Sequence, residues 1–243
     1  MKGADYGPRG RVGIATPASN PTVEPEMRLL LPAEIGVYTT RLAPESSDLP
    51  EPLRSCLAHI PETAASFGSL GIRALGLGCT RASYAAGCEL EDRLTSEAEA
   101  RLTMPVITAA QAIRCALETL GASAIALISA HPPPLAEAGY AYWGAAGFTL
   151  TARLLVGEQM AAHTSYALGS DDVLRALRLI DPRGADCIVC AGTDVPSLRA
   201  LATFRRGNPL LPVLSANLCL AWRLYQAADA ARAPPTPVGL LHA

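Results

Sequence analysis

The 243-residue sequence has few aromatic and few charged side chains, at 5% and 17% of its residues, and it contains no run of lysines and arginines. With a formal net charge of −2 and few aromatic rings, a nucleic acid is a poor candidate for a partner. The longest apolar runs, such as ASAIALISA (122–130), are about half as long as a membrane span requires. We therefore expect neither a nucleic-acid nor a membrane partner.

Hydrophobic residues, in contrast, make up 50% of the sequence, which supports a sizeable buried core and excludes disorder. The N-terminus, MKGADYGPRGRVGIATP, has no long apolar segment and no small-residue cleavage site, so we expect a cytoplasmic protein. The seven cysteines cannot all pair, because their number is odd, and in a chain of this length they do not indicate a disulfide scaffold. Most of them should be ordinary buried thiols.

Short β-rich runs alternate with helical patterns along the chain. Strands are expected at Arg11–Thr16, Gly36–Arg41, Arg73–Gly78, Pro105–Thr108, Ala124–Ser129, Thr149–Val156, Cys187–Cys190 and Pro212–Ser215. Helical patterns lie at roughly 50–69, 88–102, 109–120, 134–146, 171–180, 194–206 and 217–231. This alternation predicts βαβ crossovers, mainly parallel sheets and the α/β fold class.

The sequence also repeats itself. LTMPVITAAQAIRCALETLG (102–121) has the pattern of PLLPVLSANLCLAWRLYQ (209–226), and ALGLGCTRA (74–82) that of DCIVCAGTD (186–194), each about 110 residues apart. The repeat predicts two pseudo-symmetric half-domains, each a four-stranded mainly parallel sheet flanked by helices, with the active site between them. We assign residues 1–120 to the first half and 121–216 to the second, and expect helix 217–231 to pack back on the first.

Cys79 and Cys190 end corresponding strands of the two halves. Ligands of open α/β sheets bind beyond the carboxyl ends of the strands, so both thiols would face one cleft. A thiolate is the reactive form of cysteine, and a helix N-terminus favours it. The small or hydroxyl residues that follow, Thr80 in one loop and Ala191 and Gly192 in the other, leave backbone N–H groups for a carboxylate. The alternative is that both cysteines are structural.

Pro17, Ser19 and Asn20 follow the first strand and open onto the same cleft. Asn20 offers a donor and an acceptor to a ligand, or it is the N-cap of a helix in a Pro/Asn turn. Glu24 and Glu26 come next, at the start of the first helix, where negative charge is favoured.

His131 follows the fifth strand, in the loop equivalent to that of Asn20. It is an acid/base or a carboxylate ligand, or else a solvated loop histidine. Arg81 is the strong cation beside Cys79, and it either pairs with a substrate carboxylate or points to solvent. Cys187 and Cys190 form a C-x-x-C within a strand, where residues three apart point to opposite faces, so we expect no metal site there.

At these residues the sequence resembles the aspartate/glutamate racemase superfamily and, within it, the maleate cis-trans isomerase branch. GRVGIATPASNPTVEPE (10–26) is similar to the branch signature P-S-S-N-T-T-M-E-P-E. GLGCTRASYAAG (76–87) and VCAGTD (189–194) are similar to its two cysteine loops. The resemblance implies two four-stranded parallel sheets, a site between them, no cofactor, and a small carboxylate or dicarboxylate substrate; a homo-oligomer is compatible with it.

The resemblance also implies roles for these residues. Cys79 would add as thiolate to the substrate double bond, and rotation and elimination would give the trans product. Cys190 would be the acid/base partner, while Asn20 and the loop amides would hold the carboxylates. A two-cysteine amino-acid or hydantoin racemase is the alternative, as is a decarboxylase, although that branch has glycine at the position of Cys79. The non-enzyme alternative is a carboxylate-binding module.

The chain differs from the isomerase branch at three carboxylate contacts. His131 stands where the branch has tyrosine, and Ala191 and Gly192 stand where it has threonine and asparagine. The branch also has an asparagine near residue 160, where this chain reads GEQMAAH (157–163). These differences concern the choice of substrate and not the fold.

Overall fold

The computed structural model describes residues 5–42, 50–156 and 165–242, and it contains two four-stranded sheets. The first sheet, in the order β2-β1-β3-β4, is built from β1 (Gly10–Pro17), β2 (Ile35–Leu42), β3 (Ala74–Leu77) and β4 (Val106–Thr108). The second, in the order β6-β5-β7-β8, is built from β5 (Ala124–Ser129), β6 (Thr149–Leu155), β7 (Cys187–Cys190) and β8 (Val213–Ser215). All pairings are parallel and the order repeats after four strands, which confirms the predicted fold class.

Helices connect successive strands, as in βαβ units. They are α1 (Val23–Leu30), α2 (Pro50–Ala58), α3 (Ile60–Ala65), α4 (Thr80–Ala86), α5 (Cys88–Leu102), α6 (Ala109–Leu120), α7 (Pro133–Ala145), α8 (Ser170–Leu179), α9 (Leu198–Gly207) and α10 (Ala216–Asp229). Short 3₁₀ turns lie at Ser165–Ala167 and Pro237–His242. None of the helices within the described ranges is long and apolar enough to cross a membrane.

Two predicted helices differ from the observed ones because of proline. The helix predicted over 50–69 is two helices, since Pro61 lacks an N–H and its ring clashes with the carbonyl of a helical residue four positions earlier. The helix predicted from residue 194 starts only at Leu198, after Pro196, because the residue before a proline is held away from the helical conformation. The segment 157–164, which includes all of GEQMAAH, lies outside the described residues.

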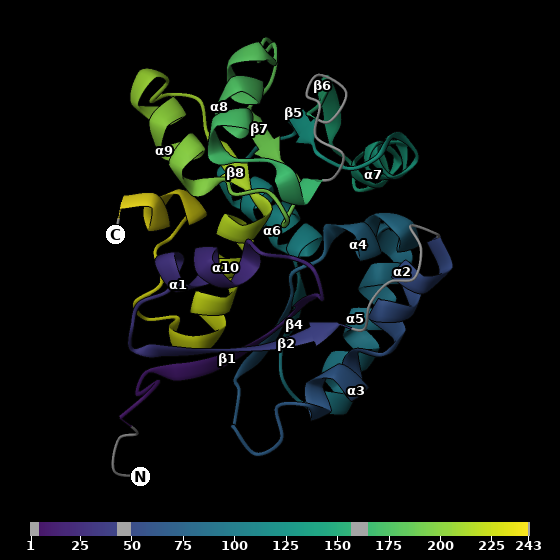
Figure 1. Cartoon of the computed structure of the whole chain (residues 1–243), viewed down its shortest axis with the longest axis vertical. Coiled ribbons are helices and arrows are strands. Elements are labelled where there is room, and N and C mark those ends of the chain that lie inside the picture. The colour runs from purple at the N-terminus through teal and green to yellow at the C-terminus, as the bar shows by residue number, and fades with distance from the viewer. Residues whose placement is uncertain (1–4, 43–49, 157–164, 243) are drawn as a thin grey trace.

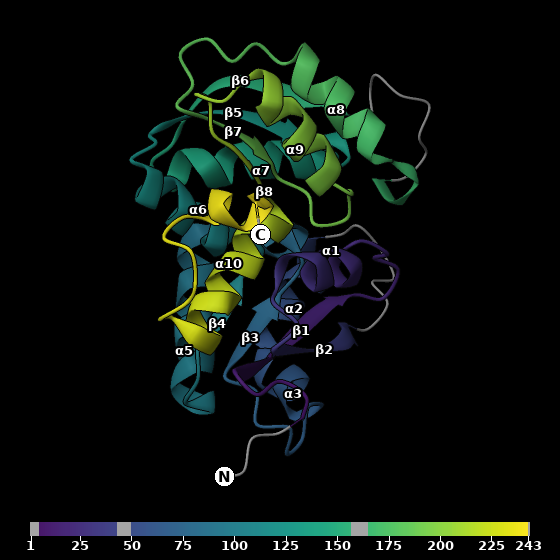
Figure 2. The ribbon, with the colours of Figure 1, turned by 90° about the vertical axis from the view of Figure 1, so that its left-hand side faces the viewer.

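The two halves are stacked along the long axis of the molecule, with β5–β8 and α7–α9 in one and β1–β4 and α2–α5 in the other (Figure 1). Helix α10 runs beside α6, as Figure 2 shows, and packs against β1, β3, β4 and α1 of the first half. The last helix therefore lies against the first sheet although it follows the last strand of the second. The exact boundaries 1–120 and 121–216 stay a prediction.

One continuous hydrophobic core joins the halves. It contains Ile14 of β1, Leu127 of β5, Val189 of β7 and Leu220 of α10, each at most 1% exposed. A second cluster lies in the first half alone, and alternate residues of β3 point into the two clusters: Ala74 into the shared core, Leu75 into the other. Both faces of the parallel sheet are thus covered, as such sheets require.

Replacing Leu220 by alanine tests how much α10 contributes to this shared core. Leu220 is fully buried, so we expect the free energy of unfolding to fall by about 2–5 kcal/mol because a cavity is left behind. Leu210→Ala is the control, because Leu210 is 96% exposed and should contribute little. Chemical denaturation measures both, and equal stabilities for the two variants would contradict the packing described for α10.

Candidate active site

Cys79 follows β3 and occupies the N-cap position of α4. Its side chain is 1% exposed, and Thr80 beside it is equally buried. The preceding residue, Gly78, donates its N–H to the carbonyl of Ala15 at 2.8 Å, which ties the loop to the end of β1. Arg81 is partly buried in the first turn of α4. A helix N-terminus stabilises negative charge, so this position suits a thiolate.

Asn20 is both a structural residue and a candidate ligand. Its Oδ1 accepts the backbone N–H groups of Thr22 at 2.8 Å and Val23 at 3.1 Å, at the start of α1. Its Nδ2 is buried and has no hydrogen-bond partner among the residues that the structure describes. A buried amide donor normally has a partner, so this group is suited to a ligand oxygen. The oxygen of Asn20 thus supports the turn before α1, although the N-cap position itself is held by Thr22, and the role of Asn20 as a ligand stays a prediction.

Arg41 of β2 fixes the loop that carries Asn20. Its guanidinium donates to the backbone carbonyls of Asn20 at 2.7 Å and Pro17 at 3.2 Å, and forms an ion pair with Glu24. Pro17 is buried at the end of β1, whereas Ser19 is exposed at the turn. The loop is thus held by its backbone, which leaves the Asn20 side chain in a defined orientation.

Cys190 is the last residue of β7, paired with Ile128 on one side and Ser215 on the other, and it is 6% exposed. With Ala191 and Gly192 it lines a cavity of about 10 Å³, the space of about one water molecule. Burial and the nearby carboxylate of Glu26 raise the pKa of the Cys190 thiol to about 12. Cys190 is therefore a thiol at neutral pH, which suits a proton donor.

Hydrogen bonds between loops bring the two halves together at the two cysteines. Three of them cross from one half to the other: Thr193 Oγ1 to the carbonyl of Gly78 at 3.0 Å, Thr22 Oγ1 to the carbonyl of Asp194 at 2.9 Å, and Thr80 Oγ1 with His131 Nε2 at 3.2 Å. The first joins the residue before Cys79 to the loop after Cys190. The loops of Asn20, Cys79, His131 and Cys190, far apart in the sequence, thus meet in one region.

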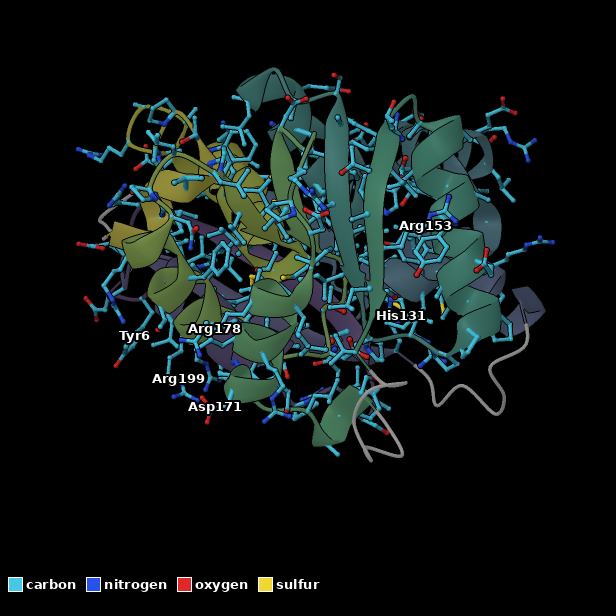
Figure 3. The ribbon with its side chains drawn as sticks, turned by 90° about the horizontal axis from the view of Figure 1, so that it is seen from above. Tyr6, His131, Arg153, Asp171, Arg178 and Arg199 are labelled. Atoms are coloured by element: carbon cyan, nitrogen blue, oxygen red, sulfur yellow. The ribbon has the colours of Figure 1, made fainter. Side chains whose placement is uncertain are left out.

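His131 is 5% exposed, so the interpretation as a solvated loop histidine is wrong. Its ring meets that of Tyr84 edge-on, with centroids 5.7 Å apart. Figure 3 shows His131 at the end of β5 beside α7, well away from Asp171 and Arg199. Those two residues form an exposed ion pair on α8 and α9, at 2.8 Å, and take no part in this region.

Glu26 was expected to serve the start of its own helix, and that expectation is wrong. Its carboxylate is buried and accepts the N–H groups of Ser197 at 2.6 Å and Leu198 at 3.1 Å, so it caps α9 in the other half. It also accepts a hydrogen bond from Asn217 Nδ2 at 2.8 Å. Burial raises the pKa of Glu26, and these hydrogen bonds oppose the shift.

A signal for this role was present in the sequence. Val23, Met27 and Leu30 are the buried apolar residues of α1, and Glu26 falls on the same helical face. A carboxylate on the apolar face of a helix is rarely buried without partners. The partners themselves, Ser197 and Asn217, carry no comparable signal.

No metal site is evident in this region. Within the ranges 5–42, 50–156 and 165–242 no three histidine, cysteine, aspartate or glutamate side chains are grouped to hold a metal ion. Cys187 is fully buried, and burial raises its pKa, so it is an inert thiol of the core.

The family model of the arylmalonate decarboxylases matches residues 12–236, nearly the whole chain. The chain therefore belongs to the arylmalonate decarboxylase family, within the aspartate/glutamate racemase-like superfamily. This agrees with the paired cysteine loops and the two repeated sheets.

Among individual proteins, the chain is similar to the maleate isomerase of Nocardia farcinica (strain IFM 10152). They are 28% identical over 236 residues, which cover 93% of this chain and 92% of that protein. A solved structure of a cysteine-to-serine variant of the N. farcinica maleate cis-trans isomerase, with a covalently bound succinylcysteine intermediate, has a TM-score of 0.77 at 27% identity and covers 90% and 92% of the two chains. Unliganded arylmalonate decarboxylase shares the fold, with a TM-score of 0.68 at 20% identity over 91% and 94%. The chain is accordingly an enzyme, and its relatives place it among the isomerases.

Gly192 in the second cysteine loop has no room for a side chain. A Cβ there would lie 2.6 Å from Asp194 Oδ1, and Asp194 is itself held by a hydrogen bond from Ser165. We expect Gly192→Ala to lower the free energy of unfolding by about 1–3 kcal/mol, because Asp194 must move. Gly144→Ala in α7 is the control: a Cβ there meets nothing within 4 Å, and alanine should stabilise the helix by about 0.5–1 kcal/mol. Thermal unfolding compares the two, and a neutral Gly192→Ala would show that the loop is not packed as described.

Proposed function

We propose that the chain is a cofactor-independent cis–trans isomerase of a small dicarboxylate of the maleate type. The observation that supports this most strongly is the junction of the two cysteine loops, made by the hydrogen bond between Thr193 and Gly78. It puts a cysteine at a helix N-terminus and a cysteine buried as a thiol into one region. A nucleophile and a proton donor are the two groups that addition to an activated double bond requires.

The proposed reaction begins with the Cys79 thiolate. Its sulfur forms a bond to one olefinic carbon, the π bond breaks, and the neighbouring carbon takes the proton of the Cys190 thiol. The former double bond is now single and rotates. Cys190, now a thiolate, removes a proton from the same carbon, the carbon–sulfur bond breaks and the trans double bond forms. Both cysteines return to their starting states, so no external oxidant or reductant is needed.

Substrate carboxylates would be held mainly by uncharged donors. Asn20 Nδ2 is buried without a partner in the described part of the chain, and the Asn20 loop is fixed by Arg41. Backbone N–H groups of the cysteine loops can add further donors, as they do at other carboxylate sites. Thr80 and His131, which contact one another at 3.2 Å, lie at the junction of the halves and are candidates for a second carboxylate.

The relatives support this proposal over the alternatives. The cysteine-to-serine variant of the N. farcinica maleate cis-trans isomerase carries a covalent succinylcysteine, the species that addition of a cysteine to maleate produces. The decarboxylase branch has glycine where this chain has Cys79. A two-cysteine racemase would use the same thiols but act on a Cα–H, so exchange of that hydrogen with solvent deuterium distinguishes it.

Replacing each cysteine by serine separates the two proposed roles. We expect Cys79→Ser to lower kcat for maleate at least about 1,000-fold with the fold retained, because a serine hydroxyl is not ionised at neutral pH. We expect Cys190→Ser to accumulate a covalent adduct on Cys79, because water can replace Cys190 as the proton donor to the enolate, whereas removal of the carbon-bound proton for elimination needs a base. Peptide mass spectrometry detects the adduct, and Cys115→Ser serves as a control for the substitution itself. Wild-type turnover in Cys79→Ser would rule out this cysteine as the nucleophile.

Asn20→Asp tests the carboxylate-binding role of the amide. Aspartate keeps the oxygen that caps α1 but replaces the unpartnered Nδ2 by a second oxygen, which repels a carboxylate. We expect KM for maleate to rise about 10- to 100-fold with the thermal stability little changed. Asn208→Asp, at an exposed asparagine after α9, is the matched control. An unchanged KM in Asn20→Asp would mean that this side chain does not contact the substrate.

A further inference from the structure

Glu26 is a buried carboxylate of the first half whose hydrogen-bond partners lie at the start of α9, in the second half, and at the start of α10. We propose that Glu26 is a positioning residue which, through Asn217 and Thr193, fixes the loop after Cys190 against the loop before Cys79. The consequence for turnover rests on the proposed function, whereas the consequence for the reactivity of the thiols does not.

The first step is the contact of Glu26 with the start of α9. Its Oε1 accepts the N–H groups of Ser197 and Leu198, the N-cap and first residue of that helix. The chain between Cys190 and Ser197 is the second cysteine loop, so the carboxylate fixes the far end of that loop. Charge-assisted bonds to backbone N–H groups at a helix N-terminus are among the stronger ones in proteins.

The second step runs through Asn217, which is fully buried in the first turn of α10. Its Nδ2 donates to Glu26 Oε2 at 2.8 Å and to the carbonyl of Thr193 at 3.0 Å. The hydroxyl of Thr193 donates in turn to the carbonyl of Gly78, next to Cys79. An unbroken chain of hydrogen bonds thus leads from Glu26 to both cysteine loops.

The third step is a second connection to Cys190 itself. The hydroxyl of Ser197 lies within hydrogen-bond distance of both Glu26 oxygens, at 3.2 and 3.3 Å, and of Ser215 Oγ at 2.8 Å. Ser215 is the neighbour of Cys190 across the sheet. One carboxylate therefore connects the end of β7, the second cysteine loop and the start of α9. Because these groups are buried, losing one hydrogen-bond partner costs free energy of folding.

Glu91 provides a comparison within the same chain. It is also fully buried and also joins the two halves, since it accepts hydrogen bonds from Thr108 Oγ1 at 2.6 Å and from the hydroxyl of Tyr142 at 2.5 Å. The hydrogen bonds from Thr108 and Tyr142 do not reach Gly78, Cys79 or the loop after Cys190, although the carboxylate also interacts with Ser83, further along α4. A role limited to holding the halves together would make Glu26 and Glu91 equivalent, whereas a positioning role would not.

The test is Glu26→Gln with Glu91→Gln as the matched control. Glutamine keeps one oxygen to accept the N–H groups of α9, but its NH₂ group faces Asn217 Nδ2, which is also a donor. Asn217 must turn away to relieve this conflict, and its hydrogen bond to the carbonyl of Thr193 is then lost. We expect kcat for maleate to fall at least about tenfold in Glu26→Gln with KM changed less than about threefold. Alkylation of Cys190 by iodoacetamide should accelerate at least about tenfold, since the loop opens more often and since the carboxylate that raises the pKa of Cys190 is gone; Asn217→Ala, which keeps that carboxylate, separates the two causes. Cys56 and Cys115, the partly exposed cysteines, are internal controls and should react at unchanged rates.

Asn217→Ala provides a second, independent variant, which keeps the carboxylate and its cap on α9. It should show the same faster alkylation of Cys190, and it decides the question if Glu26→Gln fails to fold. The double variant Glu26→Gln/Asn217→Asp restores a donor–acceptor pair between the two side chains but supplies no donor for Thr193. We therefore expect it to regain thermal stability without regaining kcat or the slow alkylation of Cys190.

Three results would overturn the positioning role: Glu26→Gln and Asn217→Ala behaving like Glu91→Gln, an unchanged alkylation rate of Cys190 in both, or recovery of kcat in the double variant. If the wild-type chain does not isomerise maleate, the alkylation rates still decide the question. Failure of the proposed reaction is thus distinguishable from failure of the positioning role.

Discussion

The proposed chemistry depends on contact between two loops that belong to different halves of the chain. Neither sheet carries both cysteines: Cys79 follows a strand of the first sheet and Cys190 ends a strand of the second. What joins them is a small set of buried hydrogen bonds, of which Thr193 to Gly78 is the most direct. The shared hydrophobic core brings the halves together, but hydrophobic contact is not directional. The relative position of the two loops is therefore specified by these polar contacts.

The two halves have the same strand order, yet their cysteines have different surroundings. Cys79 lies at the start of a helix, where backbone N–H groups point toward it. Cys190 lies at the end of a buried strand, near the carboxylate of Glu26, and its pKa is raised. The different surroundings make one suited to attack and the other to proton transfer, which is the division of roles that addition and elimination require.

Much of the fold could be predicted from the sequence, because it depends on local patterns. All eight strands lie where the alternation placed them, and Ala124–Ser129 and Cys187–Cys190 match residue for residue. The positions of Cys79 and Cys190 at strand ends followed from the internal repeat. The break between α2 and α3 was missed although Pro61 marks it, and the short helix α4 was missed because its sequence, TRASYAA, has little helical periodicity.

The polar contacts of the site could not be predicted in the same way. Glu26 is 171 residues from Ser197 and 191 from Asn217, and no local pattern indicates such pairings. The burial of His131 likewise depends on Thr80 and Tyr84 of the other half. Local patterns thus predicted which residues end the strands, whereas the interactions that set their chemistry became visible only in three dimensions.

A crystal structure of the wild-type chain with succinate tests the convergence of the two halves most directly, because succinate is a dicarboxylate without a double bond for Cys79 to attack. The proposed site requires that Cys79 Sγ and Cys190 Sγ both contact the same succinate molecule, from opposite sides of its carbon chain. Succinate that contacts only one of the two sulfur atoms, or that binds away from both loops, would contradict it.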